Sequence, residues 1–143
     1  MKTLNCFPRR SGRSYLILLL LLAPAIYAGA QDPFMQYPDI QGNTIVFASG
    51  GDLWKVPAEG GTACRLTFSD GRETFPEISP DGSLVAFTGE YDGNADVYVM
   101  NINGGNITRL TWHPGLDEVV GWNVTKNKIM FTSGRNSPSR YVK

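Results

Sequence analysis

The sequence has little of the side-chain chemistry that most hydrolases and metal sites need. It contains a single histidine and two cysteines in 143 residues, and no Gly-x-Ser-x-Gly sequence. A serine nucleophile needs a base within hydrogen-bond reach and a third group that orients the base, and a zinc site needs several nitrogen or sulfur ligands. The lone histidine, His113, stands in a Trp-His-Pro sequence that is typical of a turn. We therefore predict no catalytic, cofactor-binding or metal-binding residue in this chain.

Charge is also scarce, and its distribution is uneven. The chain has 13 basic and 13 acidic residues, but four of the basic ones lie within the first 13 positions. Residues 31–143 therefore carry a net charge of −4, which leaves no basic surface for nucleic acid or anionic lipid. Cys64 is the single cysteine in that range and cannot form an internal disulfide, so we expect it to be a small buried apolar side chain.

The first thirty residues read as a secretory signal peptide. A basic start without acidic residues is followed by the apolar run 16–22 and then by small residues ending Ala28-Gly29-Ala30. The apolar run is too short for a membrane span, which needs about 20 residues. We expect cleavage after Ala30, no membrane span in the mature protein, and export to the periplasm or the extracellular space.

The rest of the chain repeats itself. The Gly-Gly pair at 60–61 recurs at 104–105, and the Leu-Thr pair at 66–67 recurs at 110–111, each after 44 residues. A third, shorter copy begins at Val120 and stops near Val142. The spacing from Phe47 to Trp54 is 7 residues and that from Phe87 to Tyr98 is 11, which places a longer hairpin in the second copy. Such insertions at hairpin tips are tolerated in repeat folds.

Each copy contains four short apolar segments separated by turn residues. Four strands in a period of about 40–45 residues are typical of one blade of a β-propeller. The residues Ser79–Gly82 are typical of a tight turn. The apolar run 84–87 fits a middle strand that is covered on both faces. We predict an all-β fold, an incomplete β-propeller over residues 31–143, with about two and a half four-stranded antiparallel blades at approximately 35–70, 71–115 and 116–143.

This count of blades is too small for a closed ring, because propellers usually have four to eight blades. Each end would leave a blade face and a strand edge uncovered. We expect the chain to be the leading piece of a longer protein. By itself it should be marginally stable or prone to aggregation, unless several copies associate into an oligomer.

The residues from Ile78 to Thr111 resemble the repeats of the TolB and tricorn-protease group of propellers. Two further stretches, 51–57 and 112–122, are more similar to the tricorn branch. The resemblance covers about residues 35–140. It implies an amino-terminal propeller that filters or channels peptides ahead of a second propeller, a PDZ-like module and a serine-peptidase domain. The catalytic serine and histidine of that family belong to the later parts, and no residue here matches their motifs.

Three other local patterns have simpler interpretations. The acidic stretch 92–96 begins like a calcium loop, but Val97 stands where that loop needs glycine and Asn103 where it needs glutamate. The two Gly-Gly pairs are turn glycines, since no helix follows them and no lysine is placed as in a phosphate-binding loop. Glycosylation sequons begin at Asn106 and Asn123, and they matter only in a eukaryotic secretory pathway.

Three functions are compatible with these observations. In the first, the chain supplies part of the substrate-admitting propeller of an exported tricorn-like peptidase, with catalysis in a downstream domain. The second is a non-enzymatic periplasmic propeller resembling TolB that docks partner proteins. In the third, the array precedes an α/β-hydrolase domain, as in prolyl-oligopeptidase-like enzymes. In each case the expected partners are peptides or proteins, bound by the propeller.

Overall fold

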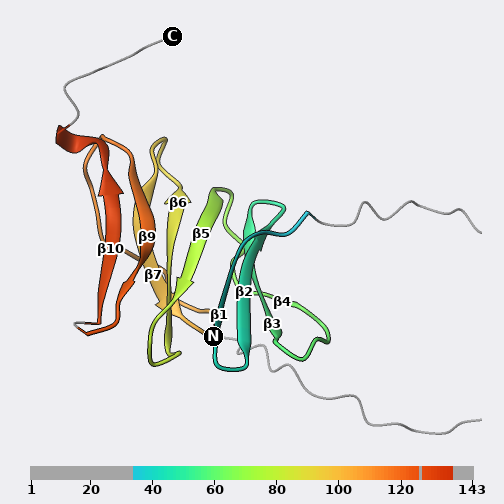
Figure 1. Cartoon of the computed structure of the whole chain (residues 1–143). Coiled ribbons are helices and arrows are strands. Elements are labelled where there is room, and N and C mark those ends of the chain that lie inside the picture. The colour runs from blue at the N-terminus through green and yellow to red at the C-terminus, as the bar shows by residue number, and fades with distance from the viewer. Residues whose placement is uncertain (1–33, 126, 137–143) are drawn as a thin grey trace, which may run out of the picture. The chain divides into compact units, whose positions relative to one another are not determined.

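The computed structural model describes residues 34–125 and 127–136, and the predicted signal peptide lies outside them. The described residues form ten strands and one short 3₁₀ turn (Figure 1). The strands are β1 (Gln36–Gln41), β2 (Thr44–Ser49), β3 (Asp52–Pro57), β4 (Cys64–Arg65), β5 (Arg72–Ile78), β6 (Leu84–Glu90), β7 (Asp96–Asn101), β8 (Thr108–Arg109), β9 (Asp117–Asn123) and β10 (Lys128–Ser133), and the 3₁₀ turn is η1 (Gly134–Asn136).

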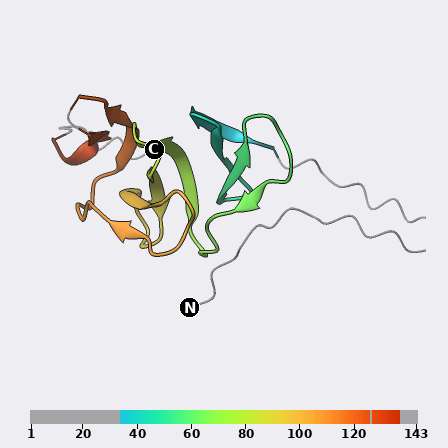
Figure 2. The same cartoon turned by 90° about the horizontal axis from the view of Figure 1, so that it is seen from below.

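These strands form three antiparallel sheets. Two sheets have four strands each, in the orders β1-β2-β3-β4 and β5-β6-β7-β8, and the third pairs β9 with β10. Seen end-on, the sheets follow one another like the blades of a fan (Figure 2). The first strands of the sheets, β1, β5 and β9, contact one another in turn and are called the inner strands below. The predicted fold class, an all-β partial propeller, is confirmed.

The corner between β5 and β6 shows why its sequence makes a tight turn. Ser79 and Leu84 close the turn with a backbone hydrogen bond of 2.9 Å, and Gly82 adopts φ = 72°. The Asp81 carboxylate accepts hydrogen bonds from the Ser79 hydroxyl and from the backbone and hydroxyl of Ser83, and these bonds lower the pKa of Asp81 to about 2. In the equivalent turn of the third sheet, Asn127 takes this role with φ = 48°, a conformation that asparagine tolerates better than most residues.

The apolar core lies between the sheets, and β6 contributes to it on both faces. Val85 and Phe87 belong to a cluster shared with the first sheet, whereas Ala86 belongs to a cluster with Val97 and Val119 on the side of the third sheet. Successive residues of a strand point to opposite faces, so a strand covered by other sheets on both faces can be apolar at consecutive positions, as at residues 84–87. This arrangement accounts for the unbroken apolar run in the sequence.

Neighbouring sheets are also joined by a repeated pair of backbone hydrogen bonds. Glu73 at the start of β5 donates its N–H to the carbonyl of Gly51 at 2.8 Å, and Asp117 at the start of β9 donates to Ala95 at 2.9 Å. In each case the β2–β3 or β6–β7 hairpin of one sheet holds the inner strand of the next. The 44-residue separation of Glu73 and Asp117 is therefore a structural repeat as well as a sequence repeat.

Candidate functional site

The residues considered as catalytic or metal-binding candidates lie in turns and ion pairs. The His113 Nδ1 accepts the backbone N–H of Gly115 at 2.9 Å, which closes its own turn. Asp92 and Asp96 of the calcium-like stretch are both bound by the Arg109 guanidinium, at 2.7 and 2.5 Å. Within the described residues, no group of three or more His, Cys, Asp or Glu side chains is placed to hold a metal ion.

The remaining candidates have local roles. The two Gly-Gly pairs occupy the connections after β3 and β7, and all four glycines have positive φ. Cys64 lies half-buried on β4, where it pairs with Lys55. Asn106 is exposed, and Asn123 is half-buried at the end of β9. The prediction that this chain holds no catalytic, cofactor or metal residue stays a prediction.

A first depression, here called the inner groove, lies where the inner strands end. Its volume is about 280 Å³. Sequence reasoning did not find it, because it joins residues that are about 40 positions apart. It is lined by Asp39, Ile40, Gln41, Glu77, Ile78, Pro80, Trp122 and Val124.

Side chains tie the inner strands together at this groove. The Asp39 carboxylate accepts the backbone N–H of Ile78 at 2.6 Å, and Gln41 donates its amide to the carbonyl of Pro80 at 2.7 Å. From the other side, Trp122 donates its indole N–H to the carbonyl of Glu77 at 2.9 Å. Strand β5 is therefore held by β1 on one side and by β9 on the other.

The Glu77 carboxyl group has an unusual environment in this groove. Burial and, to a smaller extent, the neighbouring Asp39 charge raise its pKa to about 6. Its Oε2 faces the backbone of Gly121 on β9, where an added Cβ would lie 3.8 Å away. Among the described residues, no hydrogen bond or ion pair to the Glu77 carboxylate is found.

Inner strands β1 and β5 each carry a bulge just before the groove. Tyr37 and Phe75 have φ values of 52° and 50°, and each precedes a proline. Register shifts in the pairing with the second strand occur at the same places. The two rings pack against each other with centroids 4.2 Å apart. Bulky residues rarely adopt this conformation, and bulges of this kind redirect side chains.

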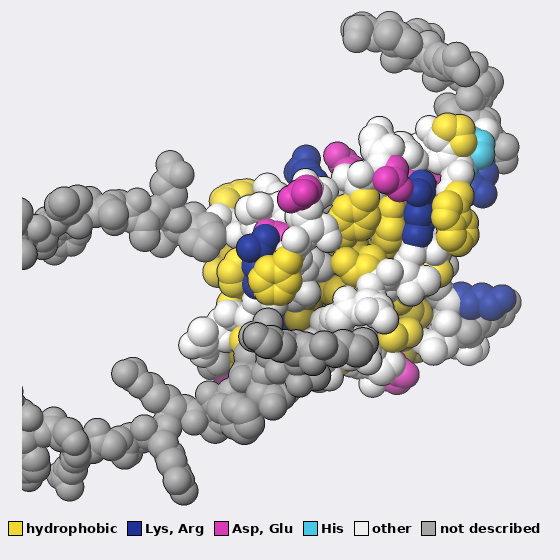
Figure 3. All heavy atoms as spheres, turned by 180° about the vertical axis from the view of Figure 1, so that it is seen from behind, with side chains coloured by type: hydrophobic (Ala, Val, Ile, Leu, Met, Phe, Trp, Pro, Cys, Tyr) yellow, Lys and Arg dark blue, Asp and Glu magenta, His cyan; other side chains and the backbone are white. Residues whose placement is uncertain are grey.

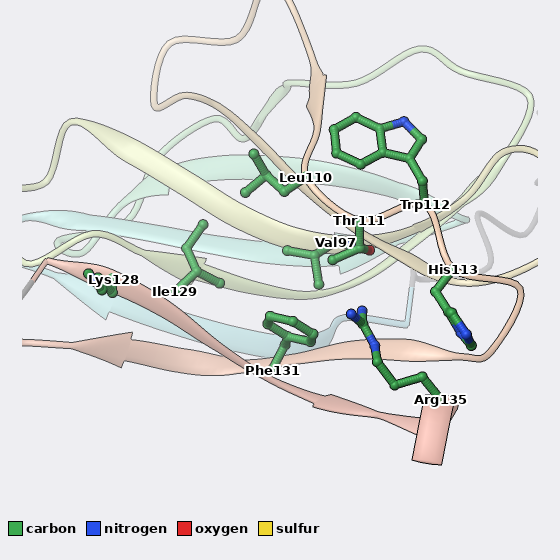
Figure 4. Close-up of a pocket in the computed structure, with 9 residues that line it drawn as sticks. All are labelled: Val97, Leu110, Thr111, Trp112, His113, Lys128, Ile129, Phe131 and Arg135. Carbon is green, nitrogen blue, oxygen red and sulfur yellow. The ribbon is translucent and has the colours of Figure 1, made fainter. Parts of the chain in front are cut away.

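A second depression, here called the outer groove, lies between the second and third sheets. It has a volume of about 620 Å³. Figure 4 shows Leu110, Trp112 and His113 along one wall, with Phe131 and Arg135 reaching in from the other. Seen from behind, hydrophobic side chains also reach the surface over much of the described part (Figure 3). The complete lining is Val97, Leu110, Thr111, Trp112, His113, Lys128, Ile129, Phe131 and Arg135.

The stacked antiparallel sheets, with their first strands side by side and a groove at the ends of those strands, define a segment of a β-propeller. Comparison with known families then places the chain more narrowly. It belongs to the family described as the tricorn protease N-terminal beta propeller domain, which matches residues 32–143. Within the described residues, no helix is long and apolar enough to cross a membrane.

Individual proteins show the same relationship. Over 94 residues the chain is 35% identical to tricorn protease homolog 1 of Streptomyces coelicolor, covering 65% of this chain and 9% of that protein. The crystal structure of the tricorn protease matches with a TM-score of 0.61 at 24% identity, over 69% of this chain and 11% of that one. TolB from Acinetobacter baumannii matches with a TM-score of 0.61 at 23% identity, over 73% and 28%. The chain thus spans about a tenth of the length of these two tricorn proteins.

Proposed function

We propose that this chain supplies part of the amino-terminal propeller of an exported tricorn-like serine peptidase. In this role it admits or binds peptide substrates, while a domain further along the parent protein hydrolyses them. The observation that carries the proposal is the family match over residues 32–143. The identity to a tricorn protease homolog supports it, because that relative is about ten times longer than the shared segment.

The geometry supports a steric and recognitional role. The inner strands of a propeller surround its central channel, and ligands bind at the ends of such strands. The inner groove and the aromatic pair Tyr37–Phe75 lie on these strands. His113 closes its own turn through Nδ1, and in this proposal the chain contributes binding while another domain cleaves the bond.

Export is the second part of the proposal, and it depends on residues 1–30. Their basic start, apolar run and Ala-Gly-Ala ending support removal by a signal peptidase. Amino-terminal sequencing of the protein recovered outside the cytoplasm tests this, with Gln31 expected as the first residue. Recovery of the protein only inside the cytoplasm, with Met1 intact, would contradict it.

The downstream sequence tests the peptidase assignment. Reading the genomic DNA after the codon for Lys143 should show further blades, then a PDZ-like module and a serine-peptidase domain. An open reading frame that ends after about six blades would instead favour a non-enzymatic TolB-like propeller, since the fold match to TolB is as good as that to tricorn. The 143-residue chain itself should not cleave fluorogenic peptides, and measurable turnover would overturn the division of roles.

A further inference from the structure

The inner groove has a composition that differs from its surroundings. Its polar side chains include two carboxylates, Asp39 and Glu77, and none of the lining residues that the structure describes is basic. Trp122 adds an indole ring to the same wall. Because hydrogen bonds to β5 hold Asp39 and Trp122, the position of both side chains is set before any ligand arrives.

The two carboxylates are not equivalent. Asp39 uses one oxygen to hold the N–H of Ile78, whereas the Glu77 carboxylate has no such partner among the described residues. Gly121 on the third inner strand lies beside Glu77 Oε2, where a Cβ built on its backbone would be 3.8 Å away, an ordinary van der Waals distance. Burial and the nearby Asp39 charge raise the pKa of Glu77 to about 6, because both disfavour the ionised carboxylate. A bound cation would stabilise that ionised form.

We propose that the inner groove binds a positively charged group of a peptide, either its α-amino group or a lysine or arginine side chain. This inference rests on the proposed function, because it names the kind of peptide that the propeller wall takes. Carboxylates bind such groups through charge-assisted hydrogen bonds, and the indole of Trp122 adds a cation–π surface. The volume of about 280 Å³ suits one side chain or a chain end.

An organic cation fits the groove better than a metal ion does. Two carboxylates supply fewer than the six to eight oxygen ligands that calcium prefers. No cluster of three metal-ligating side chains occurs in the part of the chain that the structure describes. The flat indole wall offers no ligand to a metal but suits an ammonium or guanidinium group.

The test titrates the full 143-residue chain with three peptides of equal length. The first is acetyl-Gly-Gly-Lys-Gly-Gly-amide, the second is pentaglycine amide with a free amino terminus, and the third replaces lysine of the first by uncharged norleucine. Binding is followed by the indole N–H resonance of Trp122, assigned with the Trp122→Phe variant. The dissociation constant for a charged peptide should rise at least about tenfold in Glu77→Gln, because a charge-assisted bond is lost.

Two variants make the result specific. Glu90→Gln removes the same charge from an exposed position at the other end of the sheet, and it should leave binding unchanged. Asp39→Asn keeps an oxygen that can accept the Ile78 N–H, and it should weaken binding in the same direction as Glu77→Gln. The spectra of the variants report whether each remains folded.

The outcomes separate this inference from the proposed function. Binding of the lysine or the amino-terminal peptide, with no binding of the norleucine peptide, supports the inference and identifies the source of the charge. Equal binding of all three peptides, or equal effects of Glu77→Gln and Glu90→Gln, would overturn the inference and leave peptide admission standing. If none of the three peptides binds, the inference fails, and the downstream sequence alone decides the proposed function.

Discussion

The two interfaces between neighbouring sheets are built from equivalent residues but are closed to different extents. At the first interface, between the β1–β4 and β5–β8 sheets, Leu66 is 9% exposed and Phe87 is fully buried. At the second interface, between the β5–β8 sheet and β9–β10, the residues 44 positions later, Leu110 and Phe131, are 39% and 40% exposed. The same side-chain types therefore have different surroundings at equivalent positions.

The difference follows the strands that the later sheet contributes at each interface within the described residues. At the first interface, Tyr98 on β7 stacks beside Phe87 with a centroid distance of 5.8 Å, and Tyr98 and Met100 complete the buried cluster. At the second interface the described strands of the later sheet are β9 and β10, and the outer groove occupies the corresponding place. An apolar blade face is thus buried by the whole of the next blade and not by its inner strand alone.

The largest expected effect comes from removing the equivalent aromatic ring at each interface. Phe87→Ala should lower the free energy of unfolding by about 3–5 kcal/mol, because it deletes a fully buried ring and leaves a cavity. Phe131→Ala should cost about 1 kcal/mol or less, since much of that ring already contacts water. Urea unfolding of both variants measures the difference, and equal losses would contradict the comparison.

A second pair of variants compares the buried threonines. Thr67 accepts the N–H of Leu53 at 2.9 Å and donates to Glu73 at 2.8 Å across the first interface. Thr67→Val keeps the shape but leaves the Leu53 N–H and one oxygen of Glu73 unpaired, while Tyr91 still binds the other oxygen; the change should cost about 1–3 kcal/mol. Thr111→Val should cost less, because Asp96 keeps its ion pair with Arg109. The same unfolding assay tests this, and a larger loss for Thr111→Val would refute it.

A smaller loss of stability is expected from the turns after β1 and β5, where the first and second sheets should behave alike. Gly42 and Gly82 occupy equivalent turns with φ of 58° and 72°, and an added Cβ would meet nothing within 4 Å at either. Gly42→Ala and Gly82→Ala should each cost about 1–2 kcal/mol through backbone strain alone. Similar losses would show that the contrast between the interfaces comes from packing, whereas clearly unequal ones would assign part of it to the turns.

The smallest expected effect is a change in the pH dependence of stability. Burial raises the pKa of Glu73, which accepts bonds from the neutral Tyr91 and Thr67 hydroxyls. At the equivalent position, burial alone would raise the pKa of Asp117, but bonds from Ser133 and Arg135 hold it below its ordinary value. The two carboxyl groups should therefore affect stability in opposite directions.

The sign of each contribution follows from these shifts. A raised pKa stabilises the fold below about pH 4.5, and that contribution is lost as the pH rises through the folded value. A lowered pKa stabilises the fold above about pH 3.8, and that contribution is lost on acidification. Glu73→Gln should remove the loss of stability with rising pH, and Asp117→Asn should remove the loss on acidification. Unfolding at a series of pH values measures both. Parallel pH profiles for the two variants would rule this out.

Much of the fold could be predicted because its determinants are local. The Ser79–Gly82 corner, Asn127 at a left-handed turn and the alternating faces of 84–87 follow from backbone and side-chain chemistry within a few residues. The Gly-Gly and Leu-Thr pairs recur after 44 residues, and this spacing predicted that similar sheets follow one another along the chain. The family assignment was also within reach of the sequence.

The candidate site could not be predicted in the same way. Proline after Tyr37 and Phe75 favours extended backbone at those residues, yet both adopt positive φ in a bulge. Nothing near Glu77 in the sequence indicates that it lies beside Asp39 and Gly121. At positions 91 and 135, which are equivalent in the repeat, different side chains bind the equivalent carboxylates. Tyr91 donates a hydroxyl hydrogen bond to Glu73, whereas Arg135 forms an ion pair with Asp117.

The sequence by itself determined the strands, their turns and their repetition, because these depend on residues that are close along the chain. Tertiary structure decided which apolar faces are sealed and which carboxyl groups meet, because both depend on how one sheet lies against the next. Burial and electrostatic coupling act through space, so Phe87 and Phe131, which are equivalent in the repeat, differ in the folded protein.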